Sequence, residues 1–161
     1  MIGMPRFVAD AMLGTLARWL RFFGYDCVFT ELPDDEVLRR ARSESRWLLT
    51  RDRELASRGP RTLLVKAERL DEQVAEVISR LGLAPAPTLE RARCGSCNGL
   101  LEPTPRAVVQ TLVPPHVAAT AERFRRCTEC GRVYWPGSHS RRIVARMERM
   151  VAVARVVGAA R

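Results

Sequence analysis

The sequence contains no apolar run close to the roughly 20 residues that cross a bilayer. Its N-terminus also lacks the basic and apolar regions of a secretory signal peptide, so we expect a cytoplasmic protein without membrane attachment. In a reducing compartment the five cysteines are expected to be metal ligands or free thiols rather than disulfides. Internal repeats are missing as well, and 47% hydrophobic residues in a chain of 161 suffice for a buried core.

Lysine is almost absent from the chain. Lys66 is the single lysine among 27 basic residues, which face 18 acidic ones and give a formal net charge of +9. The charge gathers near the C-terminus, where residues 132–161 hold 7 basic and 1 acidic side chains. Such a basic end favours an anionic partner, most often nucleic acid, and arginine suits bidentate contacts with phosphate. The alternative interpretation is a solvated helix face that serves only solubility.

Short apolar segments alternate with helical patterns four times in the first half of the chain. We expect strands at residues 6–9, 25–30, 47–50 and 62–65. Helices are expected at residues 11–23, 34–44, a short segment ending near Gly59-Pro60, and 71–81. Strands that are apolar throughout and alternate with helices are typical of a parallel sheet covered on both faces. The pattern therefore predicts an α/β domain over residues 1–83.

The second half of the chain is organised differently. Residues 84–93 form a proline-containing segment without period, which we interpret as a linker. A small domain is predicted at residues 94–139, with a strand at 108–113 and a helix at 117–124. Residues 140–161 are predicted to form a basic C-terminal helix, because one stripe of it is apolar: Ile143, Met147, Met150, Val151 and Ala154.

Two C-x-x-C pairs, Cys94/Cys97 and Cys127/Cys130, have the spacing of zinc knuckles. Each turn presents two thiolates on one side of a tight loop, and two such loops complete a tetrahedral site with four cysteine ligands. Asn98 and Gly131 follow the pairs, and both residue types tolerate the left-handed conformation that a knuckle needs. Four protein ligands leave no open position, so we expect a structural zinc ion. A redox dithiol is the alternative, and Cys27 is expected to be a buried core thiol.

Aspartates follow or precede the predicted strands where a parallel sheet would bring them to one edge. Asp10 ends the first strand, Asp34 and Asp35 open the second helix, and Asp52 follows the third strand. Several carboxylates at one edge repel one another unless a hard cation such as Mg²⁺ or Mn²⁺ lies between them. A simpler interpretation also holds for most of them, because Asp34, Asp35 or Asp52 can each cap a helix.

Longer stretches of the chain resemble the PIN-like nuclease family called the Mut-seven C-terminal RNase domain. The resemblance lies in F-V-A-D-A-M-L-G-T-L-A-R-W-L-R-F-F-G-Y-D (7–26), D-D-E-V-L-R-R-A (34–41) and W-L-L-T-R-D-R-E-L (47–55). C-G-S-C-N-G-L-L (94–101) and F-R-R-C-T-E-C-G-R-V-Y-W-P-G-S-H (124–139) are similar to the zinc ribbon that ends the same family. The resemblance covers nearly the whole chain and implies a PIN-like fold with cleavage of RNA that depends on Mg²⁺ or Mn²⁺.

The resemblance also implies site residues. The metal-binding acids of PIN nucleases carry over to Asp10, to Asp34 or Asp35, and to Asp52 of the T-R-D motif. A fourth acid that such nucleases usually have finds no clear match here, and Asp71 is the nearest candidate. Candidates for contacts with substrate phosphates are basic side chains near these acids or near the ribbon: Arg18, Arg21, Arg51, His139, Arg141 and Arg142.

The aromatic residues after the second knuckle have two interpretations. Tyr134 and Trp135 could stack on RNA bases, or they could pack the ribbon against the first domain, which we favour for Trp135. Trp19 and Trp47 lie in apolar surroundings and are expected in the core, and His116 is expected to be an ordinary loop residue.

The sequence thus leads to the hypothesis of a metal-dependent endoribonuclease that acts on RNA, with a structural zinc ion, a catalytic Mg²⁺ or Mn²⁺ and no organic cofactor. The rival hypothesis is a non-catalytic RNA-binding or ribosome-associated protein that keeps the fold without the chemistry. A toxin-like PIN nuclease with a protein inhibitor is a third option, which the appended ribbon makes less attractive. The oligomeric state stays open.

Overall fold

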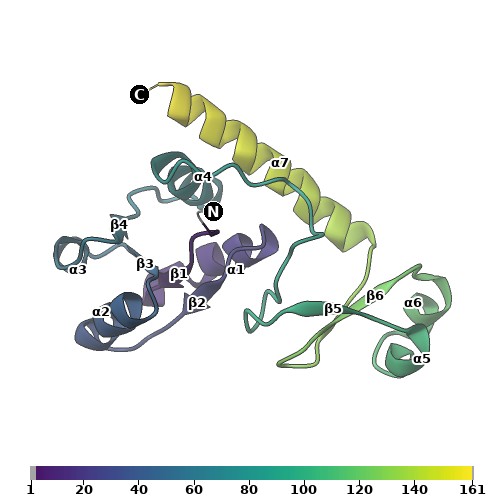
Figure 1. Cartoon of the computed structure of the whole chain (residues 1–161). Coiled ribbons are helices and arrows are strands. Elements are labelled where there is room, and N and C mark those ends of the chain that lie inside the picture. The colour runs from purple at the N-terminus through teal and green to yellow at the C-terminus, as the bar shows by residue number, and fades with distance from the viewer. Residues whose placement is uncertain (1–2, 161) are drawn as a thin grey trace.

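The four apolar segments predicted as strands form one parallel sheet (Figure 1). The structure is a computed structural model that describes residues 3–160, so residues 1, 2 and 161 of the predicted first domain and last helix lie outside it. The strands are β1 (Phe7–Ala9), β2 (Cys27–Phe29), β3 (Trp47–Thr50) and β4 (Thr62–Leu64), in the order β2-β1-β3-β4. All three pairings are parallel, so the carboxyl ends of the strands meet at one edge.

Helices cover both faces of this sheet, as the uniformly apolar strands predict. They are the 3-10 turn η1 (Ala11–Leu13) and the helices α1 (Gly14–Phe22), α2 (Asp34–Ser43), α3 (Arg53–Ser57) and α4 (Leu70–Arg80). Phe7 and Ala9 pack with residues of α1 and α4 on one face, whereas Val8 packs with α2 and α3 on the other. This alternation along β1 follows from the two-residue period of a strand. The predicted α/β architecture is confirmed.

The C-terminal helix α7 (Ser138–Ala159) belongs to the packing of the α/β unit. It begins at the end of the cysteine-containing region and runs back over α4 (Figure 1). Its predicted apolar stripe lies in the main core, where Met147 and Met150 are fully buried and Val151 and Ala154 nearly so. Within the part of the chain that the structure describes, no helix is both long and apolar enough to span a membrane.

The cysteine-containing region, residues 94–139, is called the ribbon below. It forms a three-stranded antiparallel sheet with two short helices. Its elements are β5 (Leu101–Thr104), α5 (Arg106–Val109), α6 (Pro115–Thr120), β6 (Phe124–Cys127) and β7 (Val133–Tyr134), and β6 is the central strand. The prediction of a strand at 108–113 was wrong, and the helix predicted at 117–124 is α6, which ends earlier. Val109 of α5, Val117 of α6 and the flanking Val113 and Ala121 are buried together with Phe124, so the apolar residues of this segment pack from two short helices and not from a strand.

The segment predicted as a linker lies against the α/β unit. Residues 84–93 contain no helix or strand. Even so, Ala92 is buried, and the Arg93 N–H donates a 2.8 Å hydrogen bond to the Arg21 carbonyl of α1. The first cysteine follows directly after this docked segment, so the position of the first knuckle is set by contacts with α1. The predicted domain boundaries remain predictions.

Candidate functional site

The four cysteines of the two C-x-x-C pairs form a metal-binding cluster. The Sγ atoms of Cys94, Cys97, Cys127 and Cys130 all lie within 4.8 Å of one another. Two Sγ–Sγ distances are 3.6 Å, from Cys94 to Cys130, and 3.4 Å, from Cys97 to Cys127. A tetrahedral zinc site with Zn–S bonds of about 2.3 Å has edges of about 3.8 Å. The thiols therefore stand close to the geometry that a tetrahedral ion requires, and four sulfur ligands close its coordination sphere.

Backbone conformation brings the two thiols of each pair together. Asn98 and Gly131 follow their pairs with φ of 71° and 74°, as the sequence predicts. Their N–H groups close the loops by donating to the carbonyls of Cys94 (2.9 Å) and Cys127 (3.1 Å). Gly99 has a separate requirement, because a Cβ at this position would lie 2.6 Å from the Cys127 Sγ. Glycine is needed there so that the first loop can approach the second.

Tyr134 takes part in the cysteine cluster. Its hydroxyl lies 3.0 Å from the Cys94 Sγ. Burial alone raises the pKa of the Cys94 thiol, but hydrogen bonds from Tyr134 and from backbone N–H groups outweigh it and lower that pKa to about 6. A thiol that ionises readily is a ready metal ligand. Trp135 is partly buried against the apolar cluster of the ribbon, rather than against the first domain as predicted.

The first knuckle is bonded to the edge strand β2. The Asp26 carbonyl accepts the Phe7 N–H, and the Thr30 N–H donates to the Ala9 carbonyl, so alternate residues of this segment bond to β1. Cys27 lies between two such residues and directs its N–H and C=O away from β1. The Asn98 side chain accepts the Cys27 N–H at 3.0 Å. The Arg21 guanidinium donates to the Cys27 carbonyl at 2.8 Å and to the Gly95 carbonyl at 3.0 Å. The knuckle thereby covers an edge that would otherwise present unpaired backbone groups.

The same asparagine joins a polar network at the amino end of the sheet. Its amide nitrogen donates to Asp26 at 2.7 Å, and Asp26 also accepts from Arg46 at 2.8 Å and Arg6 at 3.2 Å. Burial would raise the pKa of Asp26, but these hydrogen bonds and charges outweigh it and hold that pKa at about 2. Arg46 is almost fully buried, and its charge is balanced by Asp26 and Glu44. The network therefore fixes the knuckle to the sheet through a charged contact.

The carboxyl edge of the sheet holds Asp10 and Asp52 at the ends of adjacent strands. Asp10 follows β1, and its carboxylate accepts hydrogen bonds from the Met12 N–H (3.2 Å) and the Thr50 hydroxyl (2.5 Å). Asp52 follows β3 and caps α3 by accepting the Leu55 N–H at 2.9 Å. The Thr50 hydroxyl also accepts the Asp52 N–H at 3.0 Å. Thr50 is fully buried and bonds the Asp10 carboxylate and the Asp52 backbone, a role that sequence reasoning missed although the residue stands in the T-R-D motif.

The other predicted acids are engaged in ion pairs. Asp34 and Asp35 begin α2 at the same edge, and Arg58 contacts both of them. Asp71 begins α4 but pairs with Arg146 of α7 at 2.7 Å. Over residues 3–160, the four cysteines are the only group of three or more Cys, His, Asp or Glu side chains whose ligand atoms come close enough together to hold a metal ion. The edge therefore brings the aspartates to one side of the sheet without drawing three carboxylates into contact.

A family model described as the Mut7-C RNAse domain matches residues 5–147. This match spans the parallel sheet, the cysteine cluster and the carboxyl edge of the sheet with Asp10, Asp34, Asp35 and Asp52, called the acidic edge below. The chain belongs to the Mut7-C RNAse domain family. Comparison with curated proteins and with solved structures finds no significant match. Membership supports a ribonuclease type of function, with RNA as the class of substrate.

The basic residues predicted to contact phosphate occupy different settings in this Mut7-C chain. Arg21 is buried and bonded to carbonyl groups, so it serves the contact with the knuckle and is not free for a substrate. Arg51 donates to the Ala67 carbonyl beside the acidic edge. Arg18 is exposed on α1, 5.7 Å from the centre of the Phe22 ring. The three candidates near the start of α7 are exposed, and the described residues give them no ion pair: His139, Arg141 and Arg142.

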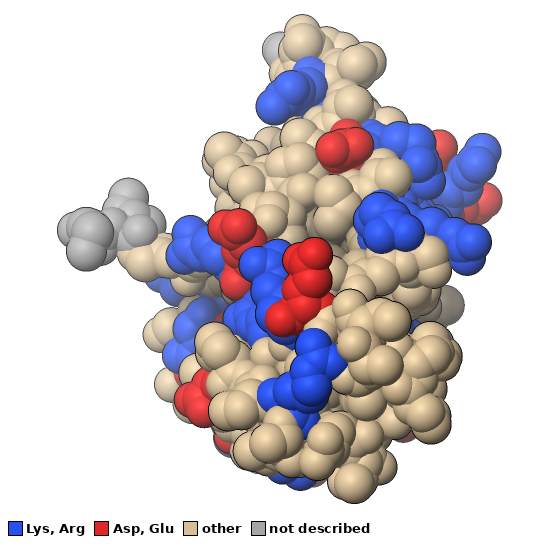
Figure 2. All heavy atoms as spheres, turned by 90° about the vertical axis from the view of Figure 1, so that its right-hand side faces the viewer, with Lys and Arg blue, Asp and Glu red and all other residues tan. Residues whose placement is uncertain are grey.

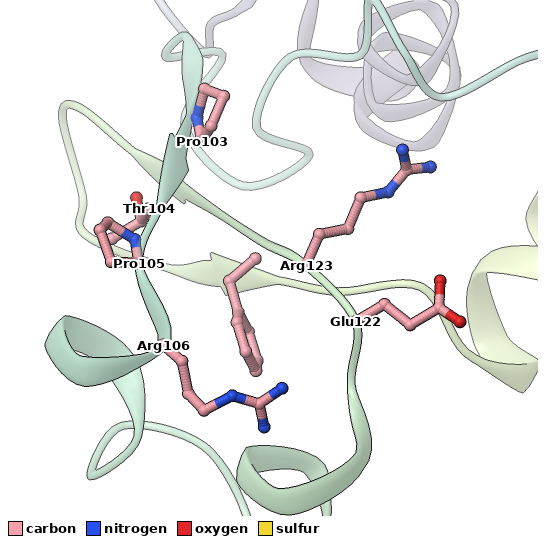
Figure 3. A pocket seen from close by; sticks show the side chains of 7 residues that line it. Pro103, Thr104, Pro105, Arg106, Glu122 and Arg123 are labelled. Carbon is pink, nitrogen blue, oxygen red and sulfur yellow. The ribbon is translucent and has the colours of Figure 1, made fainter.

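The ribbon of the Mut7-C chain has a mixed surface. On the face that Figure 2 shows, Lys and Arg side chains alternate with Asp and Glu and leave broad areas without charge. A hollow of about 400 Å³ lies between Pro105 and Arg123 in the ribbon (Figure 3). Arg106 lines it, but its guanidinium packs on Phe124 and donates to the carbonyls of Ala118 and Ala121. This arrangement is that of a braced structural unit, and the acidic edge stays the better candidate for chemistry.

Proposed function

We propose that this Mut7-C chain is a divalent-metal-dependent endoribonuclease whose reaction takes place at the carboxyl edge of the parallel sheet. The observation that carries the proposal is the pair of aspartates that follow adjacent strands, where one buried hydroxyl bonds the Asp10 carboxylate and the Asp52 N–H. Oxygen ligands in this arrangement suit Mg²⁺ or Mn²⁺. An ion bound there would supply an activated water and would stabilise the departing oxygen of a phosphodiester.

The residues of the chain have separate tasks in this proposal. Asp10 and Asp52 hold the metal, and Asp34 or Asp35 contributes the third carboxylate. Thr50 keeps the Asp10 carboxylate in place by donating a hydrogen bond from its hydroxyl to one carboxylate oxygen. Arg18, Arg51, His139, Arg141 and Arg142 hold the RNA backbone through charge-assisted hydrogen bonds with phosphates.

We also propose that the ion in the cysteine cluster is zinc and that its role is structural. Four thiolates select zinc or iron among the common metals, and the closed tetrahedral set suits a structural site. Elemental analysis of the purified chain tests this. One zinc per chain is expected, whereas bound iron, or no metal at all, would contradict the proposal.

The nuclease proposal is tested by cleavage of a mixed-sequence single-stranded RNA by the zinc-loaded chain, with Mn²⁺ or without added metal. The wild type should cut only with Mn²⁺, and Asp10→Asn should cut at least a hundredfold more slowly because it removes a charged ligand. Glu54→Gln is the matched control, since Glu54 is an exposed acid two residues beyond Asp52. Cleavage by Asp10→Asn at the wild-type rate would exclude this site.

A non-catalytic RNA-binding protein is the second candidate function. The pairing of Asp34 and Asp35 with Arg58, and of Asp71 with Arg146, favours it, because these carboxylates already have cationic partners. In that case the wild type should bind RNA with an affinity that falls steeply with salt and should cut nothing in Mn²⁺.

A further inference from the structure

Large apolar side chains are exposed at the carboxyl ends of β1 and β2, close in the fold to Asp10. Among residues 3–93, four large hydrophobic side chains are exposed: Met4, Met12, Phe29 and Leu32. Three of them lie at the carboxyl edge of β1 and β2, and Met4 precedes β1 at the opposite edge. Single exposed apolar residues are ordinary, but a group beside candidate catalytic residues marks a place where an apolar group of a ligand can bind.

Backbone hydrogen bonds and strand pairing place these three residues close to Asp10 in the fold. The Met12 N–H donates to that carboxylate, and the Met12 side chain is 73% exposed. Phe29 is paired in the sheet with Ala9, the residue before Asp10, and is 37% exposed. The Leu32 N–H donates to the Thr30 hydroxyl, and the Thr30 N–H donates to the Ala9 carbonyl, so the turn that carries Leu32 starts at the same edge.

The Phe29 ring is held in place from below. It packs against the first residue of α1, where a Cβ on Gly14 would lie 3.4 Å from two ring atoms. The ring therefore rests on helix backbone, while part of its surface stays open to solvent. An aromatic ring with little freedom loses little entropy when a flat ligand stacks on it.

We propose that Met12, Phe29 and Leu32 form a platform that binds one unpaired nucleobase of the RNA, beside the metal site proposed at Asp10. Every base has an apolar face that stacks on aromatic rings, whereas a base in a duplex is covered by its neighbours. The platform gives the site a preference for single strands without a preference for sequence. It rests on the proposed function in taking RNA as the ligand and the acidic edge as its site.

Binding of a fluorescein-labelled single-stranded RNA of ten nucleotides tests the platform, measured by anisotropy on the zinc-loaded chain without added Mg²⁺ or Mn²⁺. Stacking of a base on one aromatic residue changes affinity by about 5- to 100-fold, so Phe29→Ala should raise the Kd by about tenfold. Met12→Ala removes an apolar contact that has no ring, so it should raise the Kd by a smaller factor of about threefold. Phe29→Leu keeps the packing on Gly14 and should lie between Phe29→Ala and the wild type. Met4→Ala is the matched control at the opposite edge and should leave the Kd unchanged.

The same variants are compared on an RNA hairpin whose stem hides the bases. Its Kd should not change in Met12→Ala or Phe29→Ala. Wild-type affinity for single strands in both variants would overturn the platform, as would equal weakening for single strand and hairpin, or a wild type that binds no RNA. A wild type that binds single strands through the platform but cuts nothing in Mn²⁺ would leave the platform standing and refute the nuclease, so the two failures are distinguishable.

Discussion

Asn98 and Gly131 have nearly the same backbone conformation but different side chains, because only the first knuckle lies against the sheet. Both follow a C-x-x-C pair with a φ in the left-handed region. Glycine suffices at Gly131, where the loop is near the flexible Arg126 side chain. At Asn98 the side chain bonds the Cys27 N–H and Asp26. The asparagine at position 98 is therefore explained by its side-chain contacts with the α/β unit, and the knuckle itself requires only the left-handed backbone.

Replacing Asn98 by glycine separates these two roles. Asn98→Gly keeps the left-handed backbone, so zinc content should stay at one per chain. It removes two side-chain hydrogen bonds, and we expect the free energy of unfolding to fall by about 1–3 kcal/mol. Hydrogen exchange of the Cys27 amide should become faster. Gly131→Asn is the control and should change neither quantity much, and a Cys27 amide that keeps its protection in Asn98→Gly would refute the proposed cap on β2.

At the scale of the element, α7 joins a packed face to a charged one. Its apolar side is buried against the main core, with Met147 and Met150 fully inaccessible to solvent. Arg146 lies between the two sides, 5.1 Å from the centre of the Trp19 ring and paired with Asp71. The basic C-terminal stretch is thus a structural layer of the α/β unit, and its exposed arginines are held on a fixed surface.

The packed face of α7 should carry most of its contribution to stability. Met150→Ala removes a fully buried side chain, and large-to-small changes of this kind cost about 2–5 kcal/mol. Chemical denaturation of the zinc-loaded chain measures the cost. Val156→Ala is the control on the same helix, because Val156 is 72% exposed, and it should cost less than about 0.5 kcal/mol. Equal costs for the two variants would show that α7 does not pack as described.

At the scale of the whole molecule, hydrogen bonds join the loop that carries the first pair of the cysteine cluster to the parallel sheet. Arg21 from α1 and Asn98 from the knuckle both bond Cys27 of the edge strand. Gly24 adds a close approach, since a Cβ there would lie 2.7 Å from the Arg91 carbonyl. Because β2 leads into the turn and helix that carry Asp34 and Asp35, the knuckle also supports one side of the acidic edge.

Removal of the metal should therefore destabilise more than the ribbon. We expect a chelator, or Cys127→Ser, to lower the melting temperature of the chain and to speed hydrogen exchange in β2 and at the end of α1. The reason is that the loop bearing Asn98 loses its geometry without the ion. Cys27→Ala, which removes a thiol outside the cluster, should keep its zinc. Faster exchange confined to residues 94–139 would contradict the coupling.

Local patterns in the sequence determined the parallel sheet, the covering helices, the apolar stripe of α7 and the cysteine cluster. Such features depend on hydrophobic period, strand composition and short ligand spacing, which neighbouring residues carry by themselves. Residues 108–113 were mistaken for a strand because β-branched valines favour strands, whereas the structure has a one-turn helix followed by a turn there.

Only the tertiary structure decided the tasks of single polar side chains. Arg21 and Arg18 stand three residues apart on one helix, yet one is buried at the knuckle and the other is exposed. Thr50 bonds the Asp10 carboxylate because β1 and β3 are neighbouring strands, and Arg58 at the end of α3 pairs with Asp35 at the start of α2. A hydrogen bond between residues 23 to 75 positions apart depends on which surfaces pack together, and no local pattern encodes that choice.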